Sequence, residues 1–365
     1  MKRTETYLLN MGPQHPSTHG VLQVKLTLDG ERIVKAEPVL GYLHRGIEKL
    51  LESRTYVQGL PYTDRLDYVS SMNNNFGFAR AVEELAGIEV PRRAEFIRVI
   101  MAELNRINSH LVGIGSLAND LGASTGMLYC FRDREYILDV FNEVCGARQT
   151  FHYIRIGGVS GEFTDKARAL TERFLERVPR FLAEYDKLLT GNEIFRRRIV
   201  GISPMTKEEA LALNMTGPNL RATGVARDLR KLDAYSVYGE LDFDIPVGTH
   251  GDNWDRYIVK LKEIRESARI IRQTLDKMPE GPIMAKVPRV LKPPAGEVYS
   301  RTEGTRGELG FYLVSDGTPK PYRVHIRRPS FVNMQGLDLM CRGMLIGDSV
   351  SAYSSIDPIM GEVDC

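Results

Sequence analysis

Apolar and polar residues alternate strictly near the start of the chain. The apolar positions are Leu22, Val24, Leu26 and Leu28, and the residues between them are polar. Asp29-Gly30 follows, and after it comes the apolar pair Ile33-Val34. An alternating run that ends at Asp-Gly predicts a β-hairpin with a two-residue type I′ turn and one buried face.

Helical periodicity begins after this hairpin and continues through the middle of the chain. Pro91 is placed to open a helix in its first turn. Apolar residues then recur at spacings of three and four; they are Phe96, Ile97, Ile100, Leu104, Ile107 and Leu111. Further helices are predicted over about 67–86, 130–146, 164–189 and 253–278. Thr206 and Glu209 form a capping box, which predicts one more helix start.

β-Structure returns towards the C-terminus. Two alternating runs flank Asp316-Gly317; they are Leu309, Phe311 and Leu313 before it, and Tyr322, Val324 and Ile326 after it. The pattern predicts a second hairpin. One helix is predicted from about Leu337 to Tyr353, with Gly343 and Gly347 inside it.

These patterns predict a mainly α chain with small β elements, which is an α+β fold with a helix-bundle core and a β-hairpin at each end. We expect a single domain over residues 1–365. Its predicted parts are an N-terminal hairpin over about 6–36, a helical core over about 45–280, and a C-terminal β and helical part over about 297–365. We also expect the N-terminal loop and the C-terminal tail to meet in space.

Composition narrows the class of protein. Apolar residues make up 42% of the chain and the net charge is +2, so a globular chain without the basic surface of a nucleic-acid partner is predicted. Its cysteines are Cys130, Cys145, Cys341 and Cys365. They form no C-x-x-C motif, which favours a reducing compartment over a disulfide framework or a zinc site. We see neither a signal peptide nor an apolar run long enough to span a membrane, so any membrane link is expected to come through partner subunits.

Two histidines, His15 and His19, lie in a loop rich in glycine and proline. One interpretation is that both bond to nearby backbone. The functional interpretation is that a pinned imidazole, which titrates near neutral pH, bonds or protonates a ligand. Tyr68 has the same two interpretations, as a partly buried core residue or as a hydroxyl that donates to a carbonyl oxygen.

Asp120 ends a long apolar helix pattern. It is either a solvent-facing carboxylate near the helix end or a buried partner that orients a histidine and raises its proton affinity. The basic clusters at 196–198 and 327–328 are interpreted as solvated or subunit-contacting faces. No Walker loop, dinucleotide fingerprint or nucleophile elbow occurs in the sequence.

The last nine residues, 357–365, resemble the C-terminus of nickel–iron hydrogenase large subunits, which reads D-P-C-x-x-C-x-x-H. The three metal-related positions hold Ile359, Glu362 and Cys365 here. One carboxylate and one thiol make a poor soft-metal site, and no cysteine precedes Cys130. We therefore expect no metal in this chain and a cavity retained for another occupant.

Several segments together resemble one family. They are GPQHPSTHGVL (12–22), GYLHRGIEK (41–49), PYTDRLDY (61–68), ELNRINSH (103–110), RIGG (155–158) and GEVD (361–364). This set resembles the quinone-site subunit family of respiratory complex I, the D subunits of NADH:quinone oxidoreductase, from about residue 6 to the last residue. That family is related to nickel–iron hydrogenase large subunits, so the resemblance implies their fold.

The resemblance implies roles residue by residue. His19 matches the histidine that bonds the quinone headgroup, Tyr68 the tyrosine at its carbonyl, and Asp120 the acid that pairs with the histidine. Arg45 and Arg65 match arginines near a terminal [4Fe–4S] cluster that the neighbouring B subunit ligates. The implied partners are complex I subunits B, C, I, H and A, with quinone as substrate. The implied location is the cytoplasmic side of the bacterial inner (cell) membrane, as a peripheral subunit.

Two positions depart from the family pattern. Where many relatives have a histidine near the terminal cluster, this chain has Thr150, and His152 follows two residues later. Our hypothesis is that protonation affects the cluster potential weakly and that a low-potential quinone such as menaquinone is the substrate. The family usually ends in arginine, and this chain ends in Cys365.

Two rival functions remain at this point. The same subunit role in a ferredoxin-driven or other donor-driven complex is also compatible with the sequence, because other subunits receive the electrons. A hydrogenase large subunit is disfavoured by the missing thiolates at positions 359 and 362.

Overall fold

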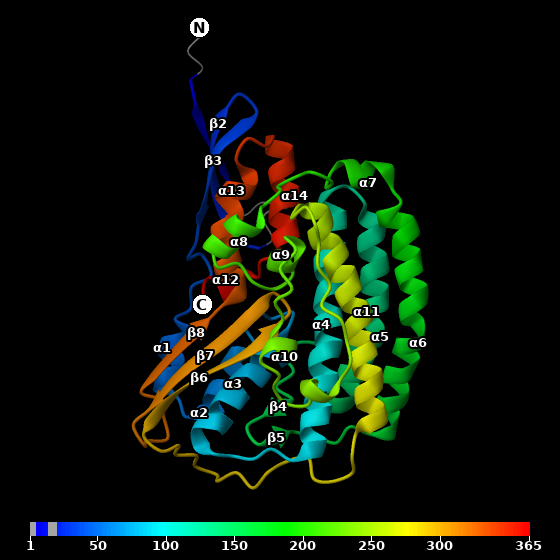
Figure 1. Ribbon diagram of the computed structural model, residues 1–365. Coiled ribbons are helices and arrows are strands. Elements are labelled where there is room, and N and C mark those ends of the chain that lie inside the picture. Colours follow the sequence, from blue (N-terminus) through cyan, green and yellow to red (C-terminus); the bar gives the residue numbers. More distant parts are fainter. Residues whose placement is uncertain (1–4, 14–19) are drawn as a thin grey trace.

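The computed structural model describes residues 5–13 and 20–365 (Figure 1). Four long helices pack side by side as a bundle; they are α4 (Arg92–Asp120), α5 (Ser124–Cys145), α6 (Asp165–Tyr185) and α11 (Asn253–Lys277). Helix α4 lies at the centre and is buried on nearly all sides, so its polar residues must find partners inside the protein. Within the described residues, none of the helices combines the length and apolar composition that a membrane span requires.

Shorter helices surround the bundle. Before it come α1 (Ile47–Ser53), α2 (Tyr56–Thr63) and α3 (Ser71–Ala86). Between α6 and α11 lie α7 (Glu193–Arg197), α8 (Lys207–Ala212), α9 (Gly217–Ala222) and α10 (Leu229–Leu232). About 52% of the chain is helical, which confirms the prediction of a mainly α chain with small β elements.

The predicted helices are present, with shifted starts. Helix α5 begins six residues before the expected 130, and α3 begins at Ser71 instead of about 67. The carboxylate of Asp67 explains the later start, because its Oδ1 accepts the N–H groups of Val69 and Ser70, both at 3.2 Å, and holds a turn there. The capping box of Thr206 and Glu209 is confirmed at the start of α8.

The N-terminal sheet has three antiparallel strands; they are β1 (Tyr7–Met11), β2 (Gln23–Asp29) and β3 (Arg32–Val39). The predicted hairpin and its buried face are confirmed. The turn is one residue later than expected, because Asp29 pairs with Arg32 and leaves Gly30-Glu31 as the loop. Strand β1 was missed because its leading apolar residues, Tyr7 and Leu8, are exposed and give no alternating pattern.

A second three-stranded antiparallel sheet packs on α3 (Figure 1); its strands are β6 (Gly296–Gly304), β7 (Gly307–Ser315) and β8 (Arg323–Arg327). Phe311 of β7 meets Phe78 of α3 edge to face, with ring centroids 5.5 Å apart. Tyr322 is 71% exposed and precedes β8, so its predicted place on the inner face is wrong. Strand β6 was missed because it buries polar residues such as Thr302 and Glu303. A two-residue pair, β4 (Ile154–Arg155) and β5 (Gly158–Val159), lies beside α4.

The single helix predicted over 337–353 is wrong. Two short helices take its place, α13 (Leu337–Cys341) and α14 (Ile346–Ile356). Two more flank them in the chain, α12 (Pro329–Asn333) and α15 (Met360–Val363). Gly343 interrupts the predicted helix with φ +79°, and its N–H donates to the Ile33 carbonyl at 2.7 Å. Backbone bonds to β3 therefore replace helical bonds at the break.

The C-terminal tail contacts the N-terminal part of the chain, as expected, although residues 14–19 of the N-terminal loop lie outside the described residues. Residues 351–365 are all buried, and the carboxylate of Asp364 accepts the N–H groups of Gly41 and Leu43 at 2.9 and 2.8 Å. Gly20 lies against Met360, close enough that a Cβ on it would be 3.6 Å from Met360 Cγ. The C-terminal tail is thus a core segment held by the N-terminal part of the chain.

Candidate functional site

Arg45 holds the tail against the segment that contains Tyr68. Its Nη2 donates to the carbonyl of Arg65 at 2.7 Å and to the carbonyl of Gly361 at 2.9 Å. Gly361 has no room for a side chain, because a Cβ there would lie 2.9 Å from the Arg65 carbonyl oxygen. Arg65 itself is exposed and donates to the Pro61 carbonyl at 2.6 Å. The two arginines therefore lie close together, one half-buried and one at the surface.

Tyr68 is half-buried and its ring lies against the tail. A Cβ on Gly361 would be 3.1 Å from the ring Cδ1. Burial raises the pKa of Tyr68, and the negative charge of Asp67 raises it further. Tyr68 is therefore a protonated hydrogen-bond donor at neutral pH.

A buried ionic cluster lies behind Tyr68. Arg306, in the turn between β6 and β7, donates to Asp67 at 2.6 Å and to the side chain of Asp357 at 3.1 Å. Lys260 of α11 forms an ion pair with Asp357 at 3.5 Å. Asp357 approaches α4 so closely that a Cβ on Gly113 would be 2.5 Å from its Oδ2. Helix, sheet and tail thus meet at charged groups that water cannot reach.

Asp120 is the last residue of α4 and is half-buried. Its carboxylate accepts a hydrogen bond from Ser354 of α14, so it faces the tail helices and is not a freely solvated charge. The predicted partner of Asp120, His19, and its neighbour His15 lie outside the described residues.

Buried Asp64 and half-buried His152 lie side by side, and Asp64 directly precedes the exposed Arg65. Asp64 Oδ2 and His152 Nδ1 are 4.0 Å apart, and neither atom has a hydrogen-bond partner among the described residues. Burial raises the pKa of Asp64 to about 7. Burial, with Arg155 and Arg65, lowers the pKa of His152 to about 4. The backbone of His152 is left-handed, with φ +47°, which costs energy for a residue with a Cβ.

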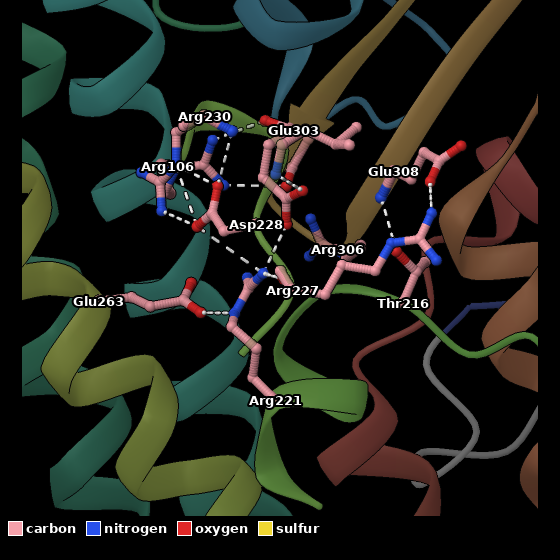
Figure 2. A network of polar contacts seen from close by, with 12 residues as sticks. Arg106, Thr216, Arg221, Arg227, Asp228, Arg230, Glu263, Glu303, Arg306 and Glu308 are labelled. Carbon is pink, nitrogen blue, oxygen red and sulfur yellow. Dashed lines mark hydrogen bonds and ion pairs between the residues drawn. The ribbon is translucent and has the colours of Figure 1, made fainter. Parts of the chain in front are cut away.

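A larger ionic network fills the core beside Arg306 (Figure 2). Arg221 reaches between Glu263 of α11 and Glu303 of β6, at 2.8 and 2.7 Å. Arg230 donates to Asp228 at 2.6 Å. Burial alone would raise the pKa of Glu263, but Arg221 and the bond from His110 lower it to about 2.

The family of this chain follows from its similarity to known proteins. The family model described as the 49 kDa subunit of respiratory-chain NADH dehydrogenase matches residues 120–365. The chain belongs to this family. Relatives over the whole length agree with it. A protein of Desulforamulus reducens is 54% identical over 362 residues, which cover 99% of each chain. One of Carboxydothermus hydrogenoformans is 53% identical over 369 residues and all of both chains, and one of Clostridium beijerinckii is 52% identical over 361 residues.

All three relatives are named as the D subunit of NADH-quinone oxidoreductase. The resemblance inferred from the sequence motifs is therefore confirmed. The roles of individual residues, and the hydrogenase-like fold that the resemblance implies, stay predictions. What the structure adds is the arrangement in which the predicted residues of this 49 kDa family member lie.

The tail positions that correspond to hydrogenase ligands now have other partners. Glu362 accepts the N–H of Ser330 at 3.0 Å, and Ile359 is buried. The carbonyl of Cys365 lies 3.0 Å from His44 Nδ1, and Arg328 donates to it at 3.3 Å. Among the described residues, no group of three or more His, Cys, Asp or Glu side chains has the geometry of a metal site.

Cys365, the unusual last residue, packs in the main apolar cluster and is 8% exposed. Burial raises the pKa of its thiol to about 11, so it stays a neutral, apolar side chain. The structure thus explains what the cysteine does, which no pattern in the sequence indicated.

The motifs in the sequence identified Arg45, Arg65 and Tyr68 as candidate site residues, and all three lie next to the C-terminal tail. Sequence reasoning missed Asp64, Lys260 and Arg306. Asp64 carried a signal, because it is adjacent to Arg65 within the motif PYTDRLDY. Arg306 carried none, since it lies in a turn whose charged residues are ordinarily solvated.

A surface hollow of about 600 Å³ lies elsewhere, between α6 and α11. Its apolar floor includes Leu175, Val178 and Leu182, and Arg265 and Arg272 lie at its rim. None of the candidate residues lines it. We therefore assign it no part in the candidate site.

Proposed function

We propose that this chain is the peripheral-arm subunit that forms the quinone headgroup site of a proton-pumping NADH:quinone oxidoreductase. The observation that carries the proposal is the position of Tyr68. Its ring lies against the buried C-terminal tail, and its protonated hydroxyl is backed by the Asp67–Arg306 ion pair. Relatives that match along the full chain are named as the D subunit of that enzyme.

Reduction of a quinone to a quinol consumes two electrons and two protons. In this proposal Tyr68 and His19 donate hydrogen bonds, and then protons, to the two quinone oxygens, and Asp120 orients His19. Two observations support these roles. Tyr68 is a half-buried donor, and Asp120 faces the tail through Ser354.

Electrons would come from a terminal [4Fe–4S] cluster that the neighbouring B subunit ligates. Arg45, Arg65 and His152 form the face of this chain that would lie near that cluster. The positive arginines would stabilise the added electron electrostatically. Thr150 and His152 both have left-handed backbones, φ +51° and +47°, so this face is fixed in an unusual conformation.

The same proposal includes the surroundings of the chain. The partners would be subunits B, C, I, H and A, and the chain would be bound on the cytoplasmic side of the cell membrane through them. A low-potential quinone such as menaquinone would be the substrate, because Thr150 replaces the histidine found in many relatives.

The test is Tyr68→Phe in the assembled complex, with His19→Ala beside it. We expect assembly to persist and quinone reductase activity to fall by about a hundredfold or more, which is the usual contribution of a positioned proton donor. Tyr42→Phe is the matched control, because Tyr42 is an exposed tyrosine whose hydroxyl donates to Gln23 at 2.5 Å. Normal activity of Tyr68→Phe with short-chain quinones would refute the assignment.

A second candidate is the same subunit role in a complex driven by ferredoxin or another donor. It is favoured by the fact that the residues of the candidate site are assigned roles only at the quinone and near the terminal cluster. None of these roles depends on which donor supplies electrons to the complex. Purified native complex that reduces quinone with reduced ferredoxin, and not with NADH, would establish this alternative.

A further inference from the structure

Glu362 has a fully buried carboxyl group, and it follows Gly361, the tail residue that packs on the ring of Tyr68. Gly361 is held by Arg45, and both tail residues lie in the short helix α15. Glu362 is 1% exposed. Because the whole tail is buried, bulk water does not reach this carboxyl directly.

Glu362 has a hydrogen bond but no counter-ion. Its Oε2 accepts the N–H of Ser330 at 3.0 Å. Across residues 5–13 and 20–365, no lysine, arginine or histidine lies within ion-pair distance of it. The nearby cations have other partners, since Arg306 binds Asp67 and Asp357, and Lys260 binds Asp357.

An unpaired carboxylate in such a place is costly, so the neutral acid is favoured. Three groups face it from the neighbouring elements. Asp67 adds a negative charge from the segment before α3, Arg306 adds a positive charge from the β6–β7 turn (Figure 2), and Ser330 of α12 donates hydrogen bonds. Burial, followed by the charge of Asp67, raises the pKa of Glu362 to about 7, so the group gains and loses a proton near cellular pH.

We propose that Glu362 holds the proton that restores the phenol of Tyr68 after this phenol has protonated the quinone. The inference rests on the proposed function and deepens it. The electrons arrive from the iron–sulfur cluster of the neighbouring subunit. The O–H bond of Tyr68 breaks as the quinone oxygen is protonated. The O–H bond of Glu362 then breaks, and a new O–H bond forms on Tyr68.

Asp67 precedes Tyr68 in the chain and is held in place by Arg306, and its charge acts on both Tyr68 and Glu362. Glu362 regains its proton from the solvent between turnovers, more slowly than it restores Tyr68, because bulk water does not contact it directly. In this scheme Glu362 never touches the quinone; it acts through Tyr68, as a positioning residue for proton supply. A second proton held in the interior is needed because the Tyr68 hydroxyl carries only one proton. The buried tail on which its ring packs keeps water away from that side.

The experiment is Glu362→Gln in the assembled complex. The amide keeps the size and can still accept the Ser330 N–H, but it holds no acidic proton. We expect kcat with a short-chain quinone to fall about tenfold or more, with KM unchanged. The limb of the pH–rate profile near neutrality should disappear, and so should the carboxylic acid C=O band that changes in infrared difference spectra on reduction. Glu362→Asp should restore both in part.

Asp364→Asn is the matched control in the same tail, because both oxygens of Asp364 accept backbone N–H groups from residues 41 and 43. It should leave the pH limb and the infrared band in place. If Glu362→Gln keeps that limb and that band, the inference is overturned. If Glu362→Gln does not assemble, an unshifted limb in Glu362→Asp overturns it instead. An active Tyr68→Phe refutes the proposed function, whereas an inactive Tyr68→Phe beside a normal Glu362→Gln refutes only this inference.

Discussion

Asp64 gives the sharpest test of the electrostatics, because it is a buried acid that forms no ion pair with a lysine or arginine of the described segments. Its pKa is raised from 3.8 to about 7. The folded chain therefore binds a proton that the unfolded chain has released between about pH 4 and pH 7. Because the folded state binds more protons in that window, the contribution of Asp64 to the free energy of unfolding is fully present below pH 4. It falls as the pH rises towards 7.

The magnitude follows from the shift. About three pKa units, at about 1.36 kcal/mol each, give a loss of about 4 kcal/mol between pH 4 and pH 7. Asp64→Asn removes the titrating group and keeps its shape. The free energy of unfolding of the variant minus that of the parent should therefore rise by up to about 4 kcal/mol across this window. His152, whose pKa shift has the opposite stability effect, is present in both proteins and cancels in the difference.

The assay is urea unfolding of the full chain at several pH values. The single tryptophan, Trp254 on α11, provides the fluorescence signal. Glu263→Gln is the control, because that buried acid has a folded pKa of about 2 and its difference from the parent should stay flat above about pH 5. A difference between Asp64→Asn and the parent that does not change with pH would refute the reasoning.

Three further predictions follow from the packing and from the motif departures. Gly113→Ala, which would stabilise an ordinary helix by about 0.5–1 kcal/mol, should instead destabilise this chain in urea unfolding, because the new methyl would meet Asp357; a more stable variant contradicts the observed contact. Tyr238→Phe should cost about 2 kcal/mol in the same assay, since it removes a 2.6 Å bond to the buried Glu103 carboxylate, and an unchanged midpoint would count against that bond. The Thr150 hypothesis predicts a terminal-cluster potential that hardly changes with pH in a redox titration of the complex, and a steep dependence would reject it.

Periodicity predicted the helices and hairpins because each buries one face against the core. It failed where polar residues occupy the inside. Strand β6 buries the polar residues Thr302 and Glu303, which hides its alternation, and the partner that makes burial of Glu303 possible, Arg221, is distant in the chain. The break at Gly343 was missed for a related reason, since β3 supplies its hydrogen bonds.

The candidate site was predictable only in part. The motifs around Arg45 and Tyr68 are continuous in sequence, so a resemblance can carry them. The ionic cluster behind them is assembled from four separate segments, which supply Asp67, Lys260, Arg306 and Asp357. No local pattern announces that a lysine on α11 and an arginine in a β-turn share one carboxylate. Only the fold brings these charges together.

The burial of residues 351–365 also limits where a chemical label can be attached. Without this segment, the N-terminal sheet and the α4–α11 pair would leave apolar and charged surfaces uncovered. A label on the thiol of Cys365 would have to displace core side chains close to Arg328 and His44, so this thiol should react slowly with thiol reagents while the chain is folded.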